Sequence, residues 1–245
     1  MTNYRFSAAL FRTVYRFTSK EKTRYYLNGL HVSRAPGNQP GVMLAATDGH
    51  KLIVAYDPDG FAPDGKGVIL RTEGHKLPGA VFKEDRNTLG TRMIEVNPDD
   101  TESCHAPGFL FDMDENGGRL PVGAHMFEVI DGDFPDITRV VPRFSNCKPV
   151  TQASTYDANY LKAFTMAAAD FCNQRSAPIS IWSEGPNDPA LVTFGPADDG
   201  KRDLFGVLMP LRANAGADAG RPQWFDTTGA PLAIVQEPEK MPVAA

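Results

Sequence analysis

The amino-acid sequence predicts an α+β protein built from repeated strand-helix-strands modules. Runs rich in strand-forming residues are bounded by turn residues, and stretches with apolar residues at helical spacing recur between them. Three modules of about 70 residues each are expected, a repeat of pattern rather than of sequence identity. The chain has 245 residues, of which 42% are hydrophobic and 22% are charged. This composition is typical of a folded globular protein and not of a disordered or fibrous one.

The first module is expected to open with a short strand and to continue with a helix from Ala8 to about Lys20. On that helix Arg12, Arg16 and Lys20 are spaced by four residues, which predicts one exposed basic row. Such a row is more often a solvated helix face than a nucleic-acid surface, so both interpretations stay open. The strand-forming stretches of this module are residues 4–8, 24–32 and 41–56.

The second module is expected to begin with a strand over residues 68–70. A helix from about Glu73 to Lys83 should follow, although Pro78 disfavours a regular helix there. Further strands are expected at residues 92–96, 109–113 and 125–130.

The third module starts near Pro149 with a strand-like run, residues 150–154, and a helix over residues 157–171 whose apolar residues share one side. Its strands are expected at residues 179–183, 190–194 and 203–211. Residues 213–245 then change in character, since Ala, Gly, Asn, Asp and several prolines predict a flexible tail.

Charge and cysteine content narrow the function classes. The formal net charge of −5 argues against a protein that coats nucleic acid with its whole surface, but it leaves room for a local basic stripe. Three widely spaced cysteines, Cys104, Cys147 and Cys172, fit reduced thiols better than disulfides or a metal site. No apolar run is long enough for a membrane span, and the first residues lack a signal core. The sequence therefore predicts a cytoplasmic protein without metal or cofactor.

Catalytic signatures are also missing from the sequence. The histidines are scattered, and neither a nucleophile elbow nor a phosphate-cradling glycine loop occurs. We therefore expect a protein that is not an enzyme.

Three segments carry a family resemblance. The first joins Arg24-Tyr25-Tyr26-Leu27-Asn28-Gly29 with Ala46-Thr47-Asp48-Gly49-His50-Lys51-Leu52, the second is Gly132-Asp133-Phe134-Pro135-Asp136 with Arg139-Val140-Val141-Pro142, and the third is Val207-Leu208-Met209-Pro210-Leu211-Arg212. In this order they resemble the DNA sliding clamp, the beta subunit of bacterial DNA polymerase III. Residues 1–142 look like its complete second domain and residues 149–212 like the second half of its third domain. Nothing corresponds to the first domain, and the tail departs from the family.

The resemblance implies a DNA-clamp fold, with helices on one face of antiparallel sheets, and a ring that encircles duplex DNA. It also implies a cleft for hydrophobic peptides of polymerases, the clamp loader and repair proteins. Carried over by motif, the cleft would be lined by Leu27, Thr47, Gly49, His50, Lys51, Leu52, Pro135, Arg139, Val140, Tyr160, Val207, Met209, Pro210, Leu211 and Arg212. A groove of Leu, Met, Val and Pro with a polar rim suits an apolar peptide. Taken alone, however, residues 47–50 could be a simple strand-to-strand turn and residues 209–211 a strand end.

The same resemblance implies sequence-independent contacts with DNA phosphates. The candidates are Arg12, Arg16, Lys20, Lys22, Arg71, Lys76 and Lys83. A homo-oligomeric ring is expected, and four chains of three modules would supply the modules of a complete ring. The alternative is a clamp-like adaptor or decoy that binds peptides without encircling DNA. In either case the tail could place Trp224-Phe225 or Leu232–Val235 in a cleft, against the simpler interpretation of a disordered tail.

Overall fold

The computed structural model describes residues 3–37, 39–76, 79, 92–99, 104–114, 116–143, 146, 154–174, 177–197 and 200–211. The chain divides into one compact unit that ends at Leu211 and a second unit of residues 212–245. The predicted tail with its two apolar patches, together with Lys83 and Arg212, lies outside the described residues.

The strands of the described residues form one antiparallel sheet of 11 strands. Its order is β1-β6-β7-β8-β5-β2-β3-β4-β11-β10-β9. The strands are β1 (Tyr4–Ser7), β2 (Leu30–Arg34), β3 (Val42–Thr47), β4 (Lys51–Asp57), β5 (Val68–Thr72), β6 (Arg92–Val96), β7 (His105–Met113), β8 (Arg119–Ile130), β9 (Ile179–Ser183), β10 (Ala190–Phe194) and β11 (Asp203–Leu208). Three 3-10 turns, η1 (Tyr25–Leu27), η2 (Glu73–His75) and η4 (Ile137–Arg139), and two helices, α1 (Ala8–Tyr15) and α2 (Ala158–Phe171), complete these elements.

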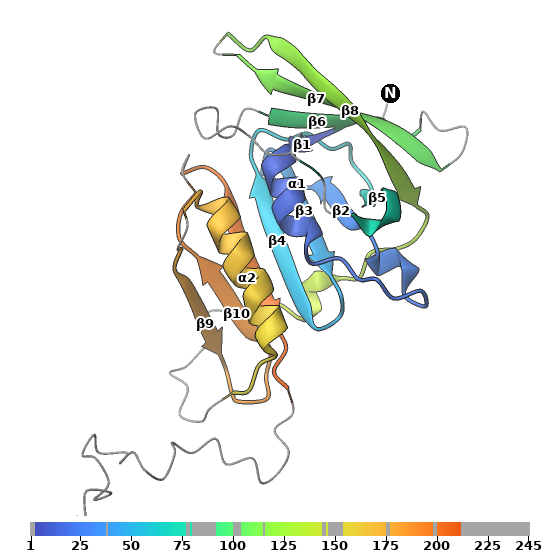
Figure 1. Cartoon of the computed structure of the whole chain (residues 1–245). Coiled ribbons are helices and arrows are strands. Elements are labelled where there is room, and N and C mark those ends of the chain that lie inside the picture. The colour runs from blue at the N-terminus through green and yellow to red at the C-terminus, as the bar shows by residue number, and fades with distance from the viewer. Residues whose placement is uncertain are drawn as a thin grey trace, which may run out of the picture. The chain divides into compact units, whose positions relative to one another are not determined.

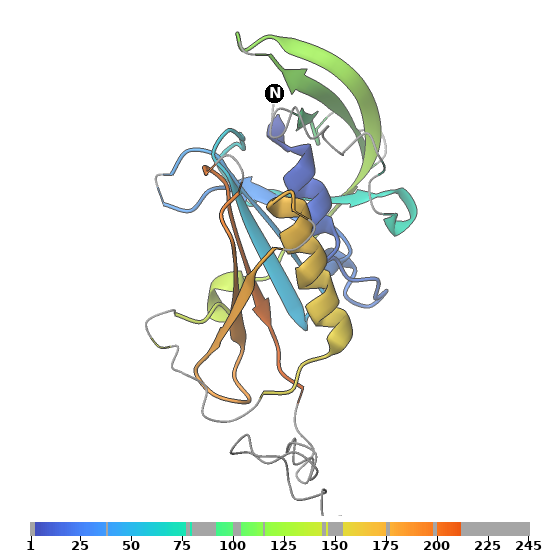
Figure 2. The ribbon, with the colours of Figure 1, turned by 60° about the vertical axis from the view of Figure 1, so that its left-hand side comes forward.

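The two helices lie beside each other on one side of the sheet (Figures 1 and 2). Between helices and sheet lies a core that includes the fully buried Phe11, Phe17, Phe127 and Phe164. Phe11 meets Phe127 edge-on at 5.3 Å between ring centroids, and Phe17 meets Phe164 in the same way at 4.9 Å. Buried aromatic pairs contribute to packing beyond their buried area. The predicted α+β class, with helices on one face of an antiparallel sheet, is confirmed.

The first helix is shorter than its sequence pattern suggested. The Ser7 hydroxyl caps it by accepting a hydrogen bond from the backbone of Leu10, but it ends at Tyr15 instead of near Lys20. After Tyr15 the chain tightens, because the amide of Phe17 donates to the carbonyl of Val14 at 3.0 Å. Lys20 therefore lies beyond the helix that carries Arg12 and is capped by Arg16, and the expectation of one continuous basic row was wrong.

The second module differs from its pattern in a similar way. Of the helix expected from Glu73 to Lys83, the described residues contain only the single turn η2. Gly74 inside it has a left-handed backbone (φ 61°), and Lys76 is already extended, so a regular helix cannot begin there. Strands β7 and β8 are longer than expected and form a hairpin that curves in Figure 2.

In the first and third modules, some strands begin or end at other residues than the sequence pattern suggested. The stretch 41–56 splits into β3 and β4, the stretch 24–32 begins with the turn η1, and β11 ends at Leu208. The helix expected over residues 157–171 is confirmed as α2, with Asp157 as its cap. The strand-like run 150–154 lies outside the described residues except for Ser154.

The third module joins the first through antiparallel pairing of β4 with β11. Gly206 of β11 lies opposite Ile53, and a side chain at position 206 would collide with the ring of Phe164. Glycine at this position therefore lets α2 pack closely on the seam. Beside it, the buried Asp57 carboxylate accepts the Ser7 amide at 2.7 Å, and Arg202 donates to the Ser7 hydroxyl at 3.2 Å. The seam thus combines backbone pairing, aromatic packing and a polar network.

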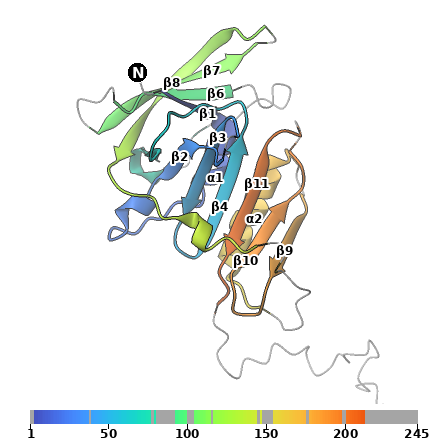
Figure 3. The same cartoon turned by 180° about the vertical axis from the view of Figure 1, so that it is seen from behind.

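The opposite face of the same strands is covered by the covering segment, residues 131–143. Its Phe134, Ile137 and Val141 pack against a small buried cluster formed by Ala45, Leu52, Val54 and Val207. Figure 3 shows η4 of this segment lying over β4 and β11. His31 of β2 holds the start of the segment, because its ring stacks on Phe134 at 4.8 Å between centroids.

Candidate peptide-binding pocket

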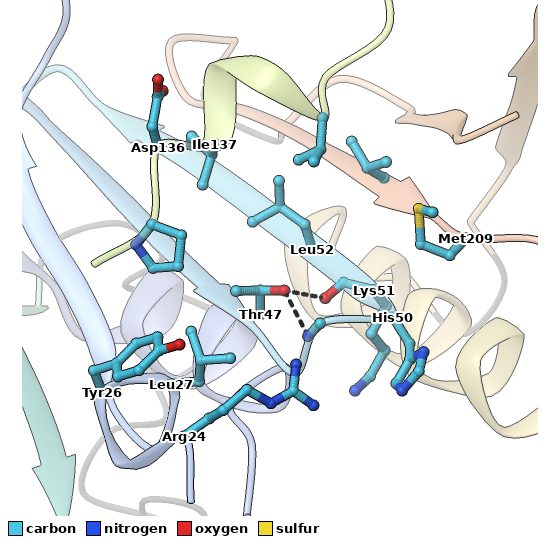
Figure 4. Close-up of a pocket in the computed structure, with 14 residues that line it drawn as sticks. Arg24, Tyr26, Leu27, Thr47, His50, Lys51, Leu52, Asp136, Ile137 and Met209 are labelled. Carbon is cyan, nitrogen blue, oxygen red and sulfur yellow. Dashed lines mark hydrogen bonds between the residues drawn. The ribbon is translucent and has the colours of Figure 1, made fainter. Parts of the chain in front are cut away.

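A pocket with a volume of about 220 Å³ lies where β4, β11 and the covering segment meet. It is on the face of the sheet away from the helices. Figure 4 shows Leu52 at its centre, with Ile137, Met209 and the pair Tyr26 and Leu27 around it. The full lining is Arg24, Tyr26, Leu27, Thr47, Gly49, His50, Lys51, Leu52, Pro135, Asp136, Ile137, Val140, Val207 and Met209.

One edge of the pocket is the tight turn between β3 and β4. The Thr47 hydroxyl donates to the carbonyl of Lys51 at 2.8 Å and accepts the amide of Gly49 at 3.0 Å, as the dashed lines in Figure 4 show. Gly49 has φ of 93°, a conformation that favours glycine. The Asp48 carboxylate accepts the amides of His50 and Lys51 at 2.9 and 3.0 Å. The motif is therefore a turn, but one whose side chains are fixed by local hydrogen bonds.

A buried lysine links this turn to the helices. Lys51 is only 9% exposed, and its ammonium pairs with the carboxylate of Asp48. The ammonium also lies 5.4 Å from the ring centre of Phe17 and 5.5 Å from that of Tyr160. Burial by itself would raise the pKa of Asp48, but the hydrogen bond and charge of Lys51 and the two turn amides lower it below its usual value. The Asp48 carboxylate therefore stays charged, and its pair with Lys51 braces the pocket edge from behind.

The floor and walls of the pocket are apolar. Leu27, Leu52 and Val207 are almost fully buried, whereas Val140 is 43% exposed at the rim. Met209 is held in place because its amide donates to the carbonyl of His50 at 2.9 Å. An apolar slot with a polar rim can take up hydrophobic side chains and orient a backbone through a few hydrogen bonds.

The structure brings most of the expected cleft residues together. Ten line the pocket: Leu27, Thr47, Gly49, His50, Lys51, Leu52, Pro135, Val140, Val207 and Met209. Tyr160 does not line it but stacks on His50 at 5.8 Å between ring centres. Arg139, Pro210 and Leu211 do not line the pocket either. Arg139 lies 3.4 Å from the Asp136 carboxylate, and Leu211 forms a backbone bridge with Thr155.

Four lining residues were missed by sequence reasoning: Arg24, Tyr26, Asp136 and Ile137. All four lie within or directly next to the three motif segments, and this proximity is the sequence signal that could have identified them. The Asp136 carboxylate caps η4 by accepting the amide of Thr138 at 3.0 Å.

The basic residues expected to contact DNA are distributed unevenly. Arg16 donates to the Asp170 carboxylate of α2 at 2.6 Å, and Arg12 lies 3.6 Å from the same oxygen. Their side chains are only 14% and 22% exposed. One carboxylate thus serves two arginines on the helical side of the molecule.

The other candidates lie apart from this pair. Lys20 and Lys22 are exposed in the turn that follows α1, and Lys76 is exposed after η2. Arg71 pairs with Glu128 across β5 and β8. Because its neighbours Leu70 and Thr72 face α1 and the core, alternation places Arg71 on the opposite face of the sheet.

Within the described residues, no three His, Cys, Asp or Glu side chains gather as metal ligands would. None of the described helices has the length and apolar character needed to span a membrane.

Comparison with known proteins supports a relation to sliding clamps. The beta sliding clamp of Caulobacter vibrioides is 34% identical over 136 residues, which cover 54% of this chain and 31% of that protein. No family model matches the chain.

Solved structures agree with this relation. A sliding clamp from Bartonella birtlesii, solved bound to griselimycin, superposes with a TM-score of 0.51 at 17% identity and covers 86% of this chain and 66% of that one. The Caulobacter crescentus beta sliding clamp gives 0.51 at 23% identity with the same coverage. At these identities the structural matches show the fold, and the chain spans less than a third of the length of the curated relative.

Proposed function

We infer that this chain, a beta-clamp-like protein that matches part of a bacterial beta sliding clamp, is a non-enzymatic processivity factor of DNA replication acting in the cytoplasm. It would tether a polymerase and other replication proteins through the pocket under the covering segment. Residues 1–142 would act as one clamp domain and residues 149–212 as a half domain.

One observation carries the proposal. Residues from three motif segments far apart in the sequence, around Thr47, Pro135 and Val207, line a single apolar pocket. Its edges are fixed before any ligand arrives, because the turn 47–50 is hydrogen-bonded internally and Lys51 is braced by Asp48. A preformed apolar slot binds a short peptide with little ordering cost.

The test is a pair of alanine substitutions in the pocket. Leu52→Ala together with Met209→Ala should weaken binding of a clamp-binding peptide from a polymerase or clamp loader by about 2–4 kcal/mol, because each removes apolar contact. Isothermal titration calorimetry measures the affinity. Phe109→Ala is the matched control, since Phe109 is 58% exposed on β7 and does not line the pocket. Unchanged affinity in the pocket variant would reject the peptide site.

The proposal also includes a ring of several copies around duplex DNA, for which four chains are one closed solution. Contact with phosphates would be independent of sequence and would weaken as salt increases. Retention of the protein on circular but not on linear DNA would support encirclement.

A second function is favoured by the charges of the helical side. The arginines Arg12 and Arg16 are both engaged by Asp170, which reduces the positive charge available to DNA. A peptide-binding adaptor or decoy that never encircles DNA would need no such charge. A protein that binds the peptide but is not retained on circular DNA would establish this alternative.

A further inference from the structure

The first two modules exchange strands in a reciprocal way. Strand β1, which leads directly into α1, pairs with β6 of the second module. Strand β5, which leads directly into η2, pairs with β2 of the first module. In both pairs, one strand precedes the helix or turn of its module (β1, β5), and its partner follows the helix or turn of the other module (β6, β2). Each module thus closes the free edge of its partner.

The third module lacks such a partner within the described residues. Strand β9, the first strand after α2, pairs with β10 on one side and forms the outer edge of the sheet (Figure 3). Its position in the module corresponds to that of β2 and β6, whose equivalent edges are occupied. An open edge presents unpaired backbone donors and acceptors to any strand that fits.

The donor segment of the third module is also available. It is Ser154–Asp157, which leads into α2 as β1 leads into α1. Asp157 caps α2 as Ser7 caps α1. The residue two positions before each cap forms an isolated bridge: Arg5 pairs with Phe61, and Thr155 pairs with Leu211. Phe61 and Leu211 each lie just after the last strand of their module. The match extends to a detail of backbone pairing, so Ser154–Asp157 is the counterpart of β1.

The side chains of the two surfaces complement each other. Strand β9 contains no charged residue and no proline, which are the features that usually protect an edge. Ile181 lies on the helix side of the sheet, since it is opposite the buried Val192, yet it is 37% exposed. Tyr156 packs partly against the core, in the position equivalent to Phe6 of β1. Phe6 is opposite Ile94, and the same register would place Tyr156 on Ile181.

The adjoining flank of α2 is uncharged except for the exposed Lys162 at its outer border. Asp170 faces α1, where it contacts both arginines. Leu161, Thr165 and Ala169 are spaced by four residues and lie away from that contact. A second helix could approach this flank while the exposed Lys162 side chain keeps its ammonium in solvent.

We propose that two copies of this chain join through their third modules, each pairing its Ser154–Asp157 segment with β9 of the other in antiparallel fashion. The two half domains would thereby complete one domain of the kind that the first and second modules form within a chain. The exchange is reciprocal and therefore has two-fold symmetry. It concerns assembly alone and holds whether or not the protein encircles DNA or binds peptides.

The experiment measures mass by sedimentation velocity over a range of concentrations of the full chain. The wild type should sediment as a dimer or a multiple of it. Ile181→Lys should halve the mass, because a lysine at an edge opposes strand pairing. Phe109→Lys is the control and should leave the mass unchanged, because Phe109 is exposed on β7, which has a strand on each side. A monomeric wild type, or an Ile181→Lys variant of wild-type mass, would overturn the proposal.

Hydrogen exchange of the wild type supplies a second test that needs no substitution. The amides of β9 and of Ser154–Asp157 should exchange more slowly when the protein is concentrated than when it is diluted to monomer. Exchange in both segments that does not change with concentration would contradict the pairing. Peptide affinity of Ile181→Lys should equal that of the wild type, since Ile181 does not line the pocket. Failure of this proposal is therefore distinguishable from failure of the proposed function.

Discussion

Replacing Asp170 by asparagine should reveal whether the helical side of the protein meets DNA. The Asp170 carboxylate lies 2.6 Å from one guanidinium nitrogen of Arg16 and 3.6 Å from one of Arg12. Asparagine has nearly the same shape but no charge, so the substitution should leave packing intact. Both arginines would then be free to bind phosphate.

The size of the effect follows from the number of charges released. Each phosphate contact steepens the dependence of log K on log salt by about 0.9 for duplex DNA. If both arginines engage phosphates, Asp170→Asn should steepen the slope by about 1.8, and if one engages, by about 0.9. The affinity should also rise at low salt, where screening is weak.

Fluorescence anisotropy of a labelled duplex, titrated at several salt concentrations, measures both quantities. Asp188→Asn is a suitable control, because Asp188 lies in the turn between β9 and β10 and is not paired with either arginine. An unchanged slope for Asp170→Asn, with unchanged thermal stability, would show that releasing Arg12 and Arg16 from Asp170 adds no contact with DNA. The adaptor function would then be preferred.

Three further predictions concern the seam and the covering segment. Phe164→Ala should destabilise the protein by about 3–5 kcal/mol in denaturant unfolding, because the ring is fully buried between Phe17 and β11. A loss below 1 kcal/mol (about the cost of a surface change) would contradict this packing. Asp57→Ala should cost about 1–3 kcal/mol because the buried Ser7 amide loses its acceptor, whereas the exposed Asp59→Ala should cost little; equal losses would refute the network. Burial lowers the pKa of His31 below its usual 6.5 in spite of its hydrogen bond to Lys66, so the contribution of His31 to stability is present above pH 6.5 and lost as pH falls through its folded-state pKa. His31→Phe should therefore flatten the stability profile below pH 6.5, and an identical profile for both proteins would exclude His31 as its source.

The sequence predicted the fold well where periodicity and packing agree. The helix α2 was predicted because its apolar residues repeat at helical spacing, and Phe164 and Ala168 are indeed buried. The helix α1 was predicted too long because Phe17 continues the apolar pattern although the backbone has already turned. Nothing in local sequence signals that a tight turn would hold Phe17 in the core without a helix.

Pocket geometry and charge pairing depended on contacts that no local pattern reveals. Ile137 reaches Leu52 only because the covering segment crosses β4 and β11. Asp170 neutralises Arg16 although the two residues are 154 positions apart in the chain. The motif segments identified the region of the pocket, whereas the partners of the basic residues required the three-dimensional structure.

The covering segment, residues 131–143, is at once a wall of the pocket and the layer that buries the outer face of β4 and β11. Ligand binding in the pocket and the stability of the β4–β11 seam are therefore linked thermodynamically. A ligand present at a hundred times its Kd would add about 2.7 kcal/mol to the free energy of unfolding, if it binds the folded chain alone. Conversely, anything that loosens Phe134 or Val141 from the sheet would reduce affinity without touching the ligand. Recruitment of a partner would thus also reinforce the joint between the first and third modules.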